Sequence, residues 1–108
     1  MESSSDVDGV IPLATFVRRQ PGGIVSRILL KKTAGSVTAF AFDAGQGLSE
    51  HTTPYDALVL VVDGAADIAI AGAGHRVKSG QVLRLPAGQP HAVTAVTAMT
   101  MLLIMIRE

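Results

Sequence analysis

Apolar and polar residues alternate in short runs along most of the 108-residue chain. The clearest run is 36–43, in which small side chains fall at one parity and two phenylalanines at the other. Alternation is typical of a β-strand, and apolar residues at both parities predict that both faces of this strand are covered. Further strands are predicted at residues 11–19, 24–32, 57–62, 65–71, 75–78, 81–85, 91–96 and 99–107.

Glycine and proline separate these runs, as at 20–23, 63–64 and 72–74. No stretch combines a 3.6-residue apolar period with capping residues, so almost no helix is expected. Short strands about ten residues apart, divided by such turns, predict an all-β sandwich or barrel. Residues 1–10 are rich in Ser and Asp and are expected to form a loose tail, which leaves 11–108 as a single domain.

The most informative stretch runs from Gly80 to His91. Gly80 is followed by five residues, Pro86, one residue, Gly88, two residues and His91. This spacing resembles the second conserved motif of the cupin superfamily. That motif normally ends with Asn four residues after the histidine, where this chain has Ala95.

The first cupin motif has a partial counterpart upstream. Gly45 is followed, after five residues, by His51, and Gly64 closes the stretch at the expected distance. Thr53 stands where cupins have a second histidine, and Ala57 stands where they have a glutamate. The spacing is retained, while two of the three ligand positions are changed.

The resemblance implies an all-β double-stranded β-helix, the jelly-roll barrel of cupins. More narrowly, the chain is similar to small single-domain bacterial cupins whose role is generally unassigned. It also implies that His51 and His91 point into the barrel, and that two copies pair as a homodimer. The pocket is expected to include His51, Thr53, Tyr55, Ala57 and His91.

Two readings of the histidines stay open. Imidazole is a good ligand for divalent transition metals such as Zn, Fe, Ni or Mn, so His51 and His91 are the candidate metal ligands. However, a metal site usually has at least three protein ligands, and neither Thr53 nor Ala57 replaces the missing pair. Alternatively, the histidines bond to each other, to water or to a bound molecule, or act as general acids and bases.

Other residues are candidates for a third ligand. Gln46 lies in a glycine-bounded loop near the expected mouth, and Glu50 should point away from His51 on an extended segment. Asp56 is one residue from the expected glutamate position, which turns it to the wrong face. His75 follows a glycine-rich turn and is predicted to be exposed. Tyr55 is expected either to pack at the barrel edge or to act as a lid.

Composition narrows the function classes. The formal net charge is zero, which argues against nucleic-acid binding, and the absence of cysteine excludes disulfides and thiolate chemistry. No signal peptide or long apolar run is visible, so a cytoplasmic protein that does not bind membranes is expected. Only 17% of residues are charged against 48% apolar, which favours a buried subunit interface and thus a homodimer.

Three functions follow from these observations. The first is a small-molecule-binding barrel with at most weak metal dependence, because a mainly apolar pocket with few polar groups is typical of such sites. The second is a metal-dependent enzyme, a dioxygenase or isomerase, that uses His51 and His91. The third is a structural or regulatory dimer with a vestigial pocket.

Overall fold

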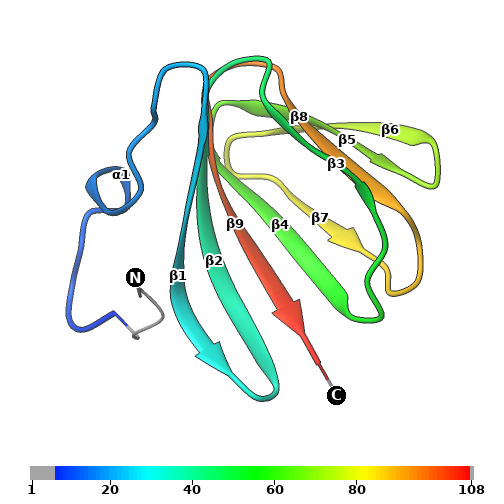
Figure 1. Cartoon of the computed structure of the whole chain (residues 1–108), viewed down its shortest axis with the longest axis horizontal. Coiled ribbons are helices and arrows are strands. Elements are labelled where there is room, and N and C mark those ends of the chain that lie inside the picture. The colour runs from blue at the N-terminus through cyan, green and yellow to red at the C-terminus, as the bar shows by residue number, and fades with distance from the viewer. Residues whose placement is uncertain (1–6, 108) are drawn as a thin grey trace.

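The structure, a computed structural model, describes residues 7–107 and arranges them in two antiparallel sheets with one short helix (Figure 1). The elements are α1 Leu13–Phe16, β1 Ile24–Lys32, β2 Gly35–Phe42, β3 Gly47–His51, β4 Asp56–Asp63, β5 Ala65–Ile70, β6 Ala73–Lys78, β7 Val82–Leu85, β8 His91–Ala95 and β9 Met99–Ile106. No helix within 7–107 is long and apolar enough to cross a bilayer.

The strands are ordered as in a jelly roll. One sheet has the order β1-β2-β9-β4-β7, and the other has the order β3-β8-β5-β6. The last strand, β9, therefore lies between β2 and β4, which come much earlier in the sequence. Figure 1 shows the two sheets facing each other across the core. This arrangement confirms the predicted all-β barrel.

The core lies between the sheets and follows from the alternation of each strand. On β4, Val59 and Val61 are fully buried, whereas Leu58 and Leu60, which alternate with them, are only partly covered. The largest inward-facing side chains of this cluster are Phe42, Val59, Val61, Ile68, Leu85, Met99 and Met101. Both faces of β2 are covered as predicted, because its outward-facing alanines are also buried.

The strand predicted at 11–19 is wrong, because α1 occupies the middle of that range. The backbone N–H of Val17 donates to the carbonyl oxygen of Leu13, which closes a single helical turn. Val17 is buried against Ala39 and Ala41 on the outer face of β2. These small side chains leave room for the turn, so the segment covers the sheet instead of extending it.

The tail predicted at 1–10 is described only in part, since residues 1–6 lie outside the described residues. The backbone N–H of Val7 donates to the carbonyl oxygen of Leu29 at 3.2 Å, which places Val7 beside β1. Val10 is completely exposed.

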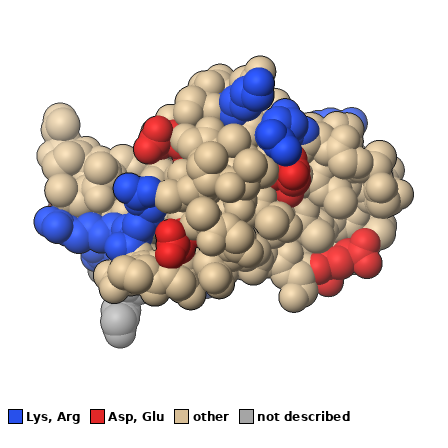
Figure 2. Space-filling model, turned by 90° about the horizontal axis from the view of Figure 1, so that it is seen from above, with Lys and Arg blue, Asp and Glu red and all other residues tan. Residues whose placement is uncertain are grey.

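Basic side chains gather at the side of the molecule that carries α1 and β1, and much of the remaining visible face carries no charge (Figure 2). Arg27 has a structural role there. Its Nη1 donates to the carbonyl oxygen of Phe16 at 3.0 Å, and its guanidinium lies 4.2 Å from the centre of the Phe16 ring. Arg27 therefore ties α1 to β1.

Candidate functional site

Two neighbouring strands bring His51 and His91 together. His51 ends β3, His91 begins β8, and the two residues are directly paired in the antiparallel register. The turn before β8 is held in place by Gly88, which has a φ of 79° and donates its N–H to the carbonyl oxygen of Thr53 at 2.8 Å. A left-handed conformation of this kind favours glycine. The second motif thus delivers His91 to the end of the barrel where β3 ends.

The two imidazoles are in direct contact. Their Nε2 atoms lie 3.1 Å apart, and the rings meet edge to face with centres 4.3 Å apart. His91 is 7% exposed, whereas His51 is exposed to solvent. The pair therefore forms a polar spot at the edge of an apolar core, open to solvent on the His51 side.

The backbone determines which nitrogen of each ring carries hydrogen. Nδ1 of His51 lies 2.8 Å from the carbonyl oxygen of Ser49, and Nδ1 of His91 lies 3.3 Å from that of Gln89. A carbonyl oxygen only accepts, so each Nδ1–H is the donor. In two neutral rings, both Nε2 lone pairs would then face each other. The arrangement calls for a proton, a hydrogen-bond donor or a cation between them.

Burial favours the neutral form of the inner histidine. Desolvation lowers the pKa of His91, the proximity of His51 lowers it further, and the hydrogen bond to Gln89 opposes both effects. A neutral imidazole with an unprotonated Nε2 can accept a hydrogen bond or bind a metal.

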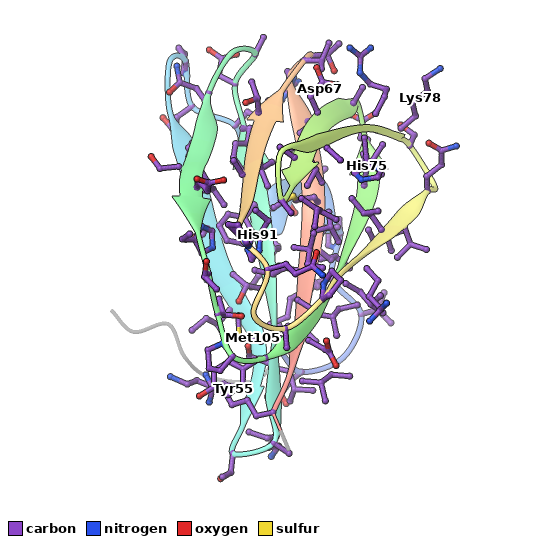
Figure 3. All side chains as sticks on the ribbon, turned by 90° about the vertical axis from the view of Figure 1, so that its right-hand side faces the viewer. Tyr55, Asp67, His75, Lys78, His91 and Met105 are labelled. Atoms are coloured by element: carbon purple, nitrogen blue, oxygen red, sulfur yellow. The ribbon has the colours of Figure 1, made fainter. Side chains whose placement is uncertain are left out.

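The other predicted pocket residues lie at the same end, in different roles. The Thr53 hydroxyl donates to the carbonyl oxygen of Tyr55 at 3.1 Å and accepts from its N–H at 3.3 Å, so it is engaged within the loop. Ala57 is buried and offers no donor atom. In Figure 3, His91, Met105 and Tyr55 follow one another from the middle of the barrel to its lower end. Tyr55 is half-buried and lies under Arg107.

The family model of the cupin domain matches residues 39–107, which include the histidine pair and most of the barrel. This chain is a cupin. A search of curated proteins gives no significant match.

Solved structures of other cupins share the fold over nearly the whole chain. A conserved protein of unknown function from Streptococcus pyogenes is 34% identical, with a TM-score of 0.90, covering 100% of this chain and 96% of that one. A cupin 2 conserved barrel domain protein from Leptotrichia buccalis is 41% identical, with a TM-score of 0.83, covering 87% of this cupin and 46% of that protein. A cupin superfamily protein from Desulfitobacterium hafniense, 23% identical, has a TM-score of 0.87 and shows the fold alone, over 99% and 97% of the chains.

None of the candidate third ligands completes a metal site. Within 7–107, no three His, Cys, Asp or Glu side chains lie close enough to hold one ion. Asp56 instead accepts the backbone N–H of Ala87 at 2.8 Å, and Gln46 bonds to Ala95 through its backbone. Glu50 and His75 are exposed, the latter on β6.

Sequence reasoning overlooked Arg107. Along β9 the inward-facing positions include Met101 and Met105, and the same alternation brings Arg107 to the inner side at the end of this strand. Its guanidinium carbon lies 5.1 Å from the centre of the Tyr55 ring. Its Nε is buried and has no hydrogen-bond partner within the described part of the chain. Following the alternation of the predicted strand 99–107 to its last residue would have placed Arg107 on the inner side of the sheet.

Proposed function

We propose that this cupin binds a small molecule at the His51–His91 end of its barrel and does not depend on a tightly bound metal. The observation that supports this most directly is the facing of two Nε2 atoms at 3.1 Å, with both Nδ1 atoms committed to backbone carbonyls. A hydrogen-bond donor on a bound molecule satisfies such a pair. The described residues supply no third metal ligand of the usual kind.

The surroundings support the same proposal. Ile70 pairs with His91, and Met105, which pairs with Ala57, lies between His91 and Tyr55 in Figure 3. An apolar lining with a few convergent polar groups is typical of small-molecule sites.

The test compares metal content and ligand binding in three untagged proteins: wild type, His91→Ala and His75→Ala. His75→Ala is the matched control, because it removes an exposed imidazole outside the site. We expect no stoichiometric transition metal in any of them. In a thermal-shift screen of metabolite-sized compounds, stabilising ligands should act on wild type and His75→Ala and lose their effect on His91→Ala. Near-stoichiometric metal that disappears only in His91→Ala would overturn the proposal.

A metal-dependent enzyme is the second candidate, and one distance favours it. Metals bind imidazole nitrogen at about 2.0–2.1 Å, so two Nε2 atoms 3.1 Å apart can both reach one ion. His51 and His91 would hold the ion, and water or substrate would complete its coordination. A bound metal would supply Lewis-acid activation of an oxygen atom on the substrate.

We also propose that two copies of the chain associate through the outer face of the five-stranded sheet. One cross-strand row on this face runs Leu30–Val37–Ile104–Leu58–Arg84, and only its last residue is charged. Exposed Val62 and Val82 continue the apolar surface. Because α1 packs only on the part of the face around Ala39 and Ala41, the rest is open to a partner as far as residues 7–107 are concerned.

A further inference from the structure

A cavity lies outside the barrel, on the outer face of the five-stranded sheet beside α1. Its volume is about 340 Å³, near the lower end of the range for small-molecule sites. The residues that border it are Ala14, Val17, Arg18, Arg19, Asp63 and Thr100. This cavity is therefore separate from the histidine pair and shares no residue with it.

The cavity lies between two walls of opposite charge. Arg18 and Arg19 directly follow Val17, which packs on the outer face of β2. Asp63 and Thr100 belong to the sheet, where the end of β4 pairs with the start of β9. One wall thus supplies two guanidinium groups, and the other supplies a carboxylate and a hydroxyl group.

The polar groups on the two walls do not satisfy one another. Within residues 7–107, Asp63 forms no ion pair with Arg18 or Arg19, and the hydroxyl group of Thr100 forms no hydrogen bond. Donors on one wall and acceptors on the other are therefore both available to a molecule that binds between them.

The balance of charge favours a ligand that carries both signs. Asp43 lies near Arg19, and its carboxylate accepts from the N–H of Gly22 at 2.6 Å and from that of Ala44 at 2.9 Å. These two hydrogen bonds, together with Arg19, lower the pKa of Asp43. Two arginines are therefore balanced by two carboxylates, those of Asp43 and Asp63. A simple anion meets no net positive charge here, whereas a zwitterion matches both walls.

An α-amino acid has the matching groups. Its carboxylate offers two oxygens to guanidinium donors, a geometry that suits arginine. Its ammonium group has three N–H donors, which carboxylate and hydroxyl oxygens accept. The small volume of the cavity and the methyl group of Ala14 on its border favour a short, apolar side chain.

We propose that this cavity is a second ligand site, which binds a free α-amino acid with a small side chain. Arg18 and Arg19 bind its carboxylate, and Asp63 binds its ammonium group together with the hydroxyl of Thr100. This site goes beyond the proposed function, because it uses none of the residues at the histidine end of the barrel.

The test is an NMR titration of the isotope-labelled full chain, in which the amide signals of Asp63 and Thr100 report on the cavity. The probes are L-alanine, propionate, which lacks the ammonium group, and ethylamine, which lacks the carboxylate. They are added at neutral pH and constant ionic strength to wild type, to Asp63→Asn, to a double variant with Arg18→Gln and Arg19→Gln, and to Arg84→Gln.

The variants are chosen to leave the fold intact. Asn-Gly suits the same hairpin turns as Asp-Gly, so Asp63→Asn preserves the turn before β5. Arg84→Gln is the matched control, because Arg84 is exposed on the edge strand β7, outside the cavity. The same spectra establish that each variant is folded.

We expect L-alanine to shift the reporter signals in a saturable way and to bind wild type at least about tenfold more tightly than propionate or ethylamine. Asp63→Asn should bind alanine no more tightly than propionate, and the double arginine variant should bind it no more tightly than ethylamine. Arg84→Gln should behave as wild type.

Two results would overturn the inference. Equal binding of alanine and propionate to wild type would exclude a site for zwitterions, and no saturable shift up to about 50 mM alanine would exclude the site itself. The compound screen with His91→Ala is decided separately, so the failure of this inference is distinguishable from the failure of the proposed function.

Discussion

The two histidines differ although they face each other. His91 is enclosed by the barrel, whereas His51 is open to solvent. Burial penalises charge, so the enclosed ring is the one whose neutral form is favoured. The pair thus joins one enclosed ring, whose neutral form is favoured, to one ring that is open to solvent.

This difference predicts a pH dependence of stability. The pKa of His91 is lowered in the native protein by burial and by His51. Between that lowered pKa and the value of about 6.5 in the unfolded chain, the unfolded state binds more protons, so lowering the pH favours unfolding. The free energy of unfolding of wild type should fall as the pH drops below about 6.5, and it should fall less in His91→Asn.

Urea denaturation between about pH 8 and pH 5, with a chelator present, measures this difference. His75→Asn is the control for the loss of an imidazole, since His75 is exposed on β6. Identical pH profiles for wild type and His91→Asn would show that burial of His91 does not contribute.

At the scale of single elements, the turn between β4 and β5 depends on Gly64. This residue has a φ of 88°, and a Cβ atom there would collide with the carbonyl oxygen of Ala98 and with Met99. Gly72, with a φ of 83°, has open space around it. Substitutions at Gly64 and Gly72 therefore distinguish the cost of backbone strain from the cost of steric collision.

We expect Gly72→Ala to cost about 1–2 kcal/mol, the cost of the left-handed conformation alone. Gly64→Ala should cost more, by about a further 1–3 kcal/mol, because the sheet must move to accept the methyl group. Chemical denaturation of both variants measures the two costs. Equal destabilisation of the two variants would mean that the backbone near Ala98 moves away from the new methyl group at no cost in free energy.

The contribution of α1 is tested by a matched pair of valines. Val17 is fully buried between this turn and β2, whereas Val10 is completely exposed. Val17→Ala should lower the free energy of unfolding by about 1–3 kcal/mol, and Val10→Ala should change it by less than about 0.5 kcal/mol. Urea denaturation compares them. A small change in the free energy of unfolding for Val17→Ala would mean that the packing of α1 on the sheet contributes little to stability.

At the scale of the whole molecule, the outer apolar face of the five-stranded sheet predicts self-association. We expect light scattering after size exclusion to give twice the chain mass of 11.2 kDa. Val82→Glu places a charge on this face, where Val82 is 59% exposed, and should yield the monomer without unfolding it. Thr94→Glu, at an exposed position on β8 of the other sheet, should remain dimeric. A monomeric wild type would contradict the proposed interface.

Much of this molecule was predictable from local pattern. Alternation identified eight of the nine strands within 7–107, all but β3, and which side chains enter the core, because side chains on an extended chain must point to opposite faces in turn. The spacing around Gly80 and His91 indicated the cupin barrel, and the family match confirms it. Alternation did not reveal α1, because a short apolar run between two turns fits a strand and a covering turn equally well.

The chemistry of the site was decided by tertiary structure. His51 and His91 are 40 residues apart, and only the pairing of β3 with β8 sets their Nε2 atoms 3.1 Å apart. The contact of Arg107 with Tyr55 likewise joins segments that are far apart in the sequence. The sequence alone determined the all-β class, through its periodicity, and the cupin barrel, through the resemblance of its motif spacing to that family. Distances, burial and unpaired donors depend on how the sheets pack, and only the folded chain decides them.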